Sequence, residues 1–156
     1  PLEMPSRVSV DEVVATAIDT SAIDAAARRI TLVPGGEEGL EVLGNADQVA
    51  VAVGNLVANA VAYSREGSSV LVSARADEDT VDLSITDQGI GIPAGEIDRI
   101  FERFYRVDPA RHRSTGGTGL GLSIVKHVAA THGGDVRVWS VEGQGSTFTL
   151  SLPRAS

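Results

Sequence analysis

The sequence contains no cysteine among its 156 residues, which excludes disulfide bonds and thiolate chemistry. Positive charge is also scarce: 13 Lys and Arg residues stand against 21 Asp and Glu residues, and the net charge is -8. That balance argues against the wide basic surface that duplex nucleic acid or anionic lipid requires. No apolar run approaches the roughly 20 residues of a membrane-spanning helix. We therefore expect a cytosolic segment that binds neither nucleic acid nor lipid.

Hydrophobic residues are nevertheless abundant, at 42% of a chain whose length is typical of one domain with one core. The chain begins at Pro1, without an initiator methionine. We therefore expect a piece of a longer protein whose membrane segments lie upstream.

Apolar residues at helical spacing predict four helices. The first starts with the capping-box spacing of Ser9 and Glu12, and the second starts after Asn45, which Gln48 follows three residues later. The breaker Gly133-Gly134 ends the last one. The predicted helices cover 9–29, 46–63, 96–104 and 120–132.

Alternating apolar and polar residues predict six strands joined in pairs. One pair, around Pro34-Gly35-Gly36, is expected to form an edge hairpin. The predicted pairs are 30–33 with 40–43, 70–74 with 81–86, and 136–141 with 147–152. The sequence thus predicts an α+β fold, a two-layer sandwich of a mixed β-sheet with helices packed on one face.

Two asparagines, Asn55 and Asn59, lie four residues apart on one face of an otherwise apolar helix, and Gln48 and Tyr63 continue this polar stripe. Burying an unpaired amide costs about 1–3 kcal/mol. The stripe therefore either pairs within the protein or borders a polar or ligand-filled cleft.

The segment 87–93 follows a strand directly and contains Asp87, Gly89 and Gly91. Glycines let the backbone approach a ligand closely, and a carboxylate accepts hydrogen bonds from an amino group but repels phosphate. This chemistry suits the amino group of adenine and indicates the base end of a nucleotide site. The alternative is a glycine turn closed by an Asx-type hydrogen bond.

A glycine-rich loop, 116–122, runs into the start of a helix, where free N–H groups and the helix dipole favour phosphate. The polar, basic stretch before it excludes a dinucleotide-binding fold, and no Gly-Lys-Ser/Thr follows that would make it a P-loop. Five arginines close by indicate either an anion partner or a solvated loop. They are Arg99, Arg103, Arg106, Arg111 and Arg113.

Taken in order, these motifs resemble those of the ATP-binding catalytic domain of bacterial two-component sensor histidine kinases. The same superfamily holds gyrase B, Hsp90 and the mismatch-repair ATPases. The matching segments are 55–64 (asparagine box), 87–93 (first glycine box), 100–106 (phenylalanine box), 116–122 (second glycine box) and 143–148 (closing glycine box). The resemblance spans nearly the whole chain.

The resemblance implies a Bergerat-type ATP-binding fold with a flexible lid over ATP, here at about 105–118. It implies that Asp87 binds the adenine amino group, that Asn59 coordinates Mg²⁺ between phosphates with Asn55 beside it, and that Thr147 supports a water network near the base. The implied ATP-binding residues are Asn55, Asn59, Tyr63, Asp87, Gly89, Gly91, Ile92, Tyr105, Arg106, Gly117, Thr118, Gly119, Leu120, Gly121, Leu122 and Thr147.

Two departures from the family pattern affect the expected chemistry. Ala62 stands where the family often has Lys or Arg near the γ-phosphate. The family's acceptor histidine is usually followed by an acidic residue, but Arg113, Val128 and Gly133 follow the three histidines here. We therefore read His112 as part of the lid and His127 and His132 as helix residues, and we expect no acceptor histidine in the chain.

The leading hypothesis is a single catalytic domain, 1–156, in which residues 1–10 form a linker from a missing dimerisation and phosphoacceptor domain. It would transfer the γ-phosphoryl group of Mg-ATP to a histidine of that domain, and a response regulator would act downstream. We expect a monomeric isolated domain and a homodimeric, membrane-anchored full-length kinase. The alternatives are a degenerate nucleotide-sensing module and a gyrase- or Hsp90-type ATPase. The latter needs a general-base carboxylate on the asparagine helix, which has none between Gln48 and Tyr63.

Overall fold

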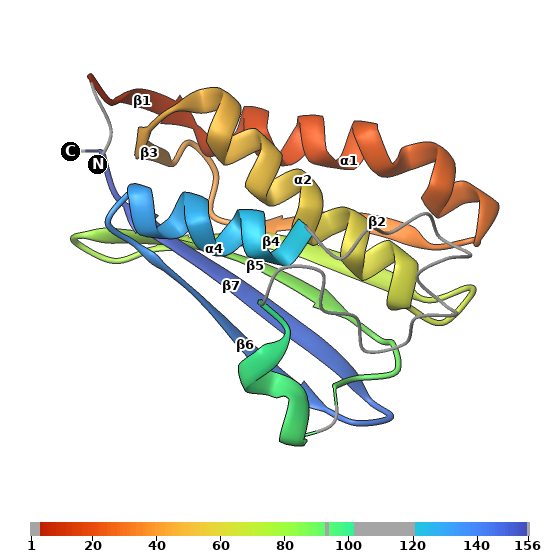
Figure 1. Ribbon diagram of the computed structural model, residues 1–156. Coiled ribbons are helices and arrows are strands. Elements are labelled where there is room, and N and C mark those ends of the chain that lie inside the picture. Colours follow the sequence, from red (N-terminus) through yellow and green to blue (C-terminus); the bar gives the residue numbers. More distant parts are fainter. Residues whose placement is uncertain (1–3, 93, 102–120, 156) are drawn as a thin grey trace.

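The computed structural model describes residues 4–92, 94–101 and 121–155. Helices are interspersed with single strands and pairs of strands along the chain (Figure 1). The elements are β1 (Ser6–Ser9), α1 (Val10–Ala27), β2 (Thr31–Gly36), β3 (Glu41–Gly44), α2 (Ala46–Tyr63), β4 (Ser69–Ala76), β5 (Thr80–Asp87), the 3-10 helix η1 (Ala94–Arg99), α4 (Gly121–Thr131), β6 (Asp135–Val141) and β7 (Gly145–Pro153).

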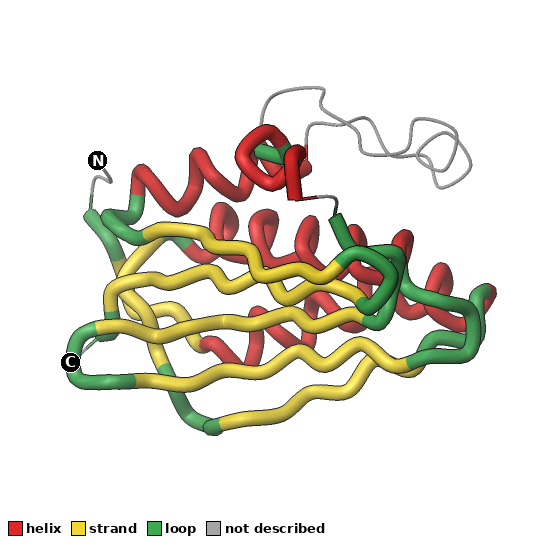
Figure 2. Tube along the Cα trace, turned by 90° about the horizontal axis from the view of Figure 1, so that it is seen from below, coloured by secondary structure: helices red, strands yellow, loops and turns green. Residues whose placement is uncertain are grey.

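Five strands form one mixed sheet in the order β2-β4-β5-β7-β6, in which β2 runs parallel to β4 and all other neighbours are antiparallel. Helices α1, α2 and α4 cover one face of this sheet (Figure 1), and no described helix covers its other face, which we call the open face (Figure 2). The predicted α+β sandwich with helices on one face is confirmed, as are the hairpins β4–β5 and β6–β7. Among the described residues, no helix is both long and apolar enough to cross a membrane.

The predicted hairpin of 30–33 with 40–43 is wrong. Strand β2 pairs with β4 in the main sheet, whereas β3 pairs with β1 in a separate two-stranded sheet. Contacts with the start of α1 redirect the chain between them: Gly39 N–H donates to Asp11 Oδ2 at 2.9 Å, and Val10 N–H donates to the Leu40 carbonyl at 3.0 Å. Residues 6–9, expected within a linker, form β1.

The helix starts follow the sequence signals. Ser9 Oγ accepts from Glu12 N–H at 3.3 Å, and Asn45 Oδ1 accepts from Gln48 N–H at 3.0 Å, so both predicted N-caps are confirmed. Helix α4 ends just before Gly133, which has a φ of 73°. The short helix expected at 96–104 is the 3-10 helix η1 at Ala94–Arg99, and the expected range beyond residue 101 lies outside the described residues.

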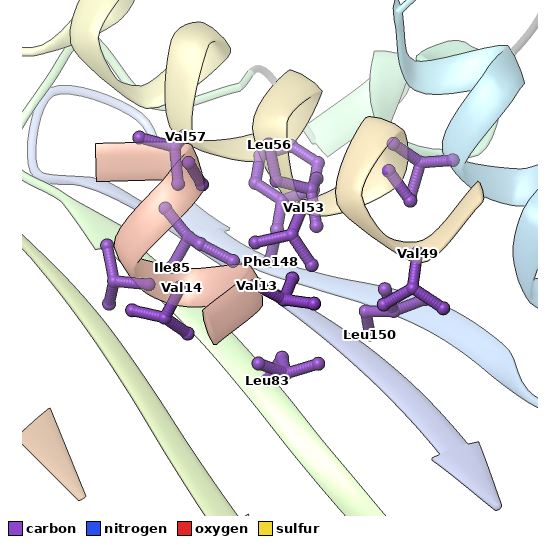
Figure 3. Packing of buried hydrophobic residues seen from close by; sticks show 14 of the residues in the cluster. Val13, Val14, Val49, Val53, Leu56, Val57, Leu83, Ile85, Phe148 and Leu150 are labelled. Atoms are coloured by element: carbon purple, nitrogen blue, oxygen red, sulfur yellow. The ribbon is translucent and has the colours of Figure 1, made fainter. Parts of the chain in front are cut away.

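The hydrophobic core lies between α2 and the sheet. Val49, Val53, Leu56 and Val57 of α2 project toward Leu83, Ile85, Phe148 and Leu150 of the sheet, with α1 alongside (Figure 3). Burying each such side chain stabilises the fold by about 1.5–3 kcal/mol. Because α2 also packs against both α1 and α4, the core fixes the helix that carries the asparagine stripe.

Candidate functional site

The core-facing side of the sheet changes from apolar to polar at one end of β5, β7 and β6. Side chains two residues apart on a strand share a face, so the register defines rows across the sheet. The last apolar rows are Leu83 with Leu150 and Val136, and Ile85 with Phe148 and Val138. The next row is Asp87 with Ser146 and Ser140, which we call the polar row. It continues the core face just beyond the hydrophobic core.

Asp87 is buried in this row, with 5% of its surface exposed. Its Oδ1 accepts from the backbone N–H of Gly89 at 2.9 Å and from that of Ser146 at 3.2 Å. Burial of a carboxylate is costly unless hydrogen bonds replace its water, and these donors supply part of that replacement. Since one donor is two residues away and the other is on β7, the bonds fix the carboxylate against both the loop and the sheet.

The loop 88–92 after Asp87 is tied to the β6–β7 hairpin. Ile92 N–H donates to Ser140 Oγ at 2.8 Å, and Gly143 N–H donates to the Ile90 carbonyl at 2.7 Å. Gly91 has a φ of 69°, and a Cβ there would overlap the Val141 carbonyl. Glycine is therefore required at Gly91 by both conformation and space.

The same loop meets the end of the asparagine helix. Ser64, which follows α2, forms an isolated β-bridge with Gly89, and a Cβ on Gly89 would overlap the Tyr63 carbonyl. This close approach brings the C-terminal end of α2 beside the Asp87 loop.

At its middle, α2 meets the start of α4. A Cβ on Gly121 would lie 3.7 Å from Asn55 Oδ1, so the first residue of α4 borders the asparagine stripe. Asn55, Asn59 and Tyr63 are half-buried, and within the described part of the chain neither asparagine side chain has a recorded hydrogen bond. Asn55 and Tyr63 are eight residues apart, about 12 Å along the helix. The stripe thus extends from the start of α4 to the Asp87 loop.

Most described members of the predicted site come together around this stripe. They are Asn55, Asn59, Tyr63, Asp87, Gly89, Gly91, Ile92 and Gly121. Leu122 is half-buried and packs against the hydrophobic core. Several predicted members, the expected lid and His112 lie outside the described residues. These predicted members are Tyr105, Arg106, Gly117, Thr118, Gly119 and Leu120.

Thr147 is not brought to Asp87. It lies on the open face of the sheet, where its Oγ1 and that of Thr86 are 3.0 Å apart. Ser146, one residue earlier, occupies the core face beside Asp87. Ser146 and Ser140 were not among the predicted site residues, although the alternation of β7, continued back from Phe148, would have placed Ser146 on the core-facing side.

His132 is a buried residue that joins two helices. Its Nε2 accepts from Asn45 N–H at 3.1 Å, and its Nδ1 lies 2.8 Å from the Val128 carbonyl. A neutral ring with the proton on Nδ1 satisfies both bonds. This histidine therefore fixes the end of α4 to the N-cap of α2.

Residues 44–156 match the family described as histidine kinase-, DNA gyrase B- and HSP90-like ATPases. The matched segment contains α2, the polar row and α4, which are all the elements that build the described site.

Among curated proteins, the chain is 48% identical over 146 residues to the sensor-like histidine kinase SenX3 of Mycolicibacterium smegmatis, covering 94% of this chain and 38% of that protein. It is 45% identical over 109 residues to the sensor histidine kinase WalK of Bacillus subtilis, covering 69% of this chain and 18% of WalK. The chain thus spans well under half the length of these relatives.

Two solved structures agree with the fold. The mycobacterial sensor histidine kinase MprB superposes with a TM-score of 0.82 at 32% identity, covering 96% of this chain and 97% of that one. Full-length ShkA in complex with AMPPNP gives a TM-score of 0.84 at 28% identity, covering 99% of this chain and 32% of ShkA.

Proposed function

The chain belongs to the family of histidine kinase-, DNA gyrase B- and HSP90-like ATPases, as a sensor histidine kinase catalytic domain, and on that premise we propose that it transfers phosphate from Mg-ATP to a histidine. The acceptor would lie on a separate dimerisation and phosphoacceptor domain. The observation that carries the proposal is the placement of Asp87 at one end of the asparagine stripe and the start of α4 beside Asn55. The adenine base carries an amino group that donates hydrogen bonds, and the Asp87 carboxylate is an acceptor. The phosphates are anions, and the start of α4 offers N–H donors beside Asn55.

At the base end, Asp87 would accept a hydrogen bond from the adenine amino group, and the loop 88–92 would contact the ring. Tyr63 would lie near the base from the end of α2. The similarity to ShkA, whose structure is a complex with the adenine nucleotide AMPPNP, supports binding of an adenine nucleotide by this fold.

At the phosphate end, Asn59 would coordinate Mg²⁺ and Asn55 would stand beside it. The site fits this ion, since amide oxygens are suitable ligands and both side chains are half-buried without a hydrogen-bond partner among the described residues. Bound Mg²⁺ would neutralise charge on the phosphates. The first N–H groups of α4, together with the predicted glycine loop 116–120, would donate to phosphate oxygens.

In this proposal neither of the described histidines, His127 and His132, is the phosphoacceptor. His132 is buried in structural hydrogen bonds, and His127 is exposed on α4 without an acidic residue after it. The domain would act by holding ATP in position while the acceptor imidazole approaches the γ-phosphate. We place the full-length protein as a membrane-anchored homodimer that signals to a response regulator, with this domain on the cytoplasmic side.

A second candidate function is nucleotide sensing without transfer. Ala62 favours it, because no side-chain cation is present one turn beyond Asn59. The gyrase- or Hsp90-type ATPase alternative is disfavoured, since α2 has no carboxylate between Gln48 and Tyr63 to act as a general base.

Calorimetric titration tests nucleotide binding. We expect the chain to bind ATP more tightly with Mg²⁺ than without it, and Asn59→Ala to remove most of that difference. Ser84→Ala is the matched control, because Ser84 pairs with Thr149 at 3.1 Å on the open face of the sheet. An Asn59→Ala variant with an unchanged response to Mg²⁺ would refute the ligand assignment.

A transfer assay separates the two candidate functions. Mixed with γ-labelled ATP and the separately produced phosphoacceptor domain of its own kinase, the chain should give acid-labile, base-stable label on that domain and none on itself. Transfer should be slow, because separating the domains removes their high effective concentration. Tight ATP binding with no transfer would favour the sensing module.

A further inference from the structure

The hydroxyl of Ser140 makes three hydrogen bonds where strand β6 ends. It donates to the Gly145 carbonyl at 3.0 Å, accepts from Ile92 N–H at 2.8 Å, and lies 2.9 Å from Ser146 Oγ. Since its single proton goes to Gly145, the Ser146 hydroxyl is the donor in the third bond. One half-buried side chain thus joins β6, the loop 88–92 and the start of β7.

Two of these partners lie against Asp87, and the third ends the loop that follows it. Ser146 N–H donates to the Asp87 carboxylate, and a Cβ on Gly145 would overlap the Asp87 carbonyl. Ile92 ends the loop 88–92, which contains Gly89, the other donor to Asp87. Loss of the Ser140 hydroxyl would therefore loosen the aspartate's surroundings on two sides while leaving the carboxylate itself in place.

We propose that Ser140 is a positioning residue for base recognition, which holds the loop 88–92 and Ser146 so that Asp87 selects a purine bearing a 6-amino group. This inference rests on the proposed function, because it assigns Ser140 to the base end of the same site. Ser140 touches no nucleotide in this proposal and acts through Asp87. Its contribution is therefore to selectivity between bases and not only to the stability of the fold.

The discriminating measurement compares ADP with inosine diphosphate, which carries a 6-oxo group in place of the 6-amino group. The parent chain should prefer ADP. In Ser140→Ala, the Ile92 N–H and the Ser146 hydroxyl both lose their partner, and we expect ADP affinity to fall about tenfold. Inosine diphosphate affinity should change far less, so that the preference shrinks. Ser140→Thr keeps a hydroxyl and should restore the preference.

The matched control is Ser84→Ala, which removes a hydroxyl pair on the opposite face of the same sheet and should leave both affinities unchanged. If Ser140→Ala fails to fold, judged by its thermal unfolding, Ser146→Ala breaks the same hydroxyl pair from β7 and keeps the backbone donor to Asp87. It should shift the preference in the same direction by a smaller factor.

The outcomes are distinguishable. A parent that binds neither nucleotide would refute the proposed function and the inference with it. A parent that prefers ADP, with Ser140→Ala or Ser146→Ala showing the same preference, would refute the role of Ser140 and leave the proposed function standing. An equal loss for both nucleotides would reduce Ser140 to a structural residue and would also overturn the inference.

Discussion

Two aspartates at opposite ends of β5 make similar hydrogen bonds in different surroundings. Asp77 precedes the strand in the β4–β5 turn, where its Oδ1 accepts from the N–H groups of Asp79 and Thr80 at 2.9 and 2.8 Å. Asp87 ends the strand and accepts from Gly89 and Ser146. The hydrogen-bond donors to the Asp77 carboxylate are within three residues of it, whereas the Asp87 carboxylate also accepts from a strand residue 59 positions away.

Burial separates their roles. Asp77 is exposed to water, and its carboxylate accepts the hydrogen bonds that close the β4–β5 turn. Asp87 lies beside an apolar core, where a hydrogen bond to a ligand competes with less water and is worth more. Since the two carboxylates make similar local hydrogen bonds, burial beside the core is the property that would suit Asp87, and not Asp77, to the base recognition proposed for it.

The first prediction tests this contrast directly. Asp87→Asn keeps the shape and one acceptor oxygen but replaces the other oxygen with an amino group, which opposes the adenine amino group. Charge-assisted hydrogen bonds contribute about 1.5–3 kcal/mol, so we expect ADP affinity to fall by roughly 10- to 100-fold in calorimetry. Asp77→Asn, the control, should bind as the parent does. Equal binding by both variants would remove Asp87 from base recognition.

Two glycines of one turn extend the comparison. Gly143 and Gly145 both have positive φ, 83° and 123°, but a Cβ on Gly143 meets nothing within 4 Å, whereas one on Gly145 overlaps the Asp87 carbonyl. Gly143→Ala should cost only the strain of the backbone conformation, about 1–2 kcal/mol, and leave ADP binding intact. Gly145→Ala should destabilise the fold further and weaken ADP binding. Chemical denaturation and calorimetry check the two effects, and similar losses in both variants would contradict the packing around Asp87.

The sequence predicted the elements whose signals are local. The caps at Ser9 and Asn45 and the boundaries of α2 are readable because capping and helical spacing act within a few residues. The separation of β3 from β2 was not readable, since the chain before β3 is held by a long-range contact from Gly39 to Asp11 that no local pattern encodes.

The site residues also divide into those that the sequence predicted and those that only the strand register reveals. Asp87 and the asparagine stripe stood out by residue type in an apolar context, as polar groups that need partners. Ser140 did not stand out, because a serine near the end of a strand is ordinary until the register places it beside Ser146 and the Ile92 N–H. Thr147 was assigned to the base side because of its motif, yet the two-residue period of β7 turns it to the open face.

A third prediction contrasts the phosphate end with the base end. Ala62 is half-buried on α2, one turn beyond Asn59, and Ala62→Lys would add a cation near the phosphates. A partly exposed ion pair contributes about 0.2–1 kcal/mol, so the ratio of ATP to ADP affinity should rise a few-fold. The preference for ADP over inosine diphosphate should not change, since the base end is untouched. An unchanged ATP to ADP ratio would indicate that the site already neutralises the terminal phosphate.

The smallest expected effect is a pH-dependent change in stability on substitution of the exposed Asp77. Hydrogen bonds from the Thr80 and Asp79 N–H groups and from the Thr80 hydroxyl, with a lesser contribution from Arg154, hold the pKa of Asp77 below its ordinary value of 3.8. A lowered folded-state pKa means that the ionised carboxylate stabilises the fold fully above the unfolded-state value, and that this stability is lost as the pH falls through the folded-state value.

Asp77→Ala should therefore lower the free energy of unfolding by a constant amount above about pH 5, and the difference from the parent should shrink as the pH falls below 3.8. Urea denaturation of both proteins across this range measures it. Nucleotide binding at neutral pH should stay unchanged, because Asp77 and Asp87 lie at opposite ends of β5. If the difference in free energy of unfolding between the parent and Asp77→Ala grew as the pH fell, the turn would not stabilise the ionised carboxylate. A loss of ADP binding in Asp77→Ala would mean that the two ends of the strand are coupled, and that burial alone does not separate their roles.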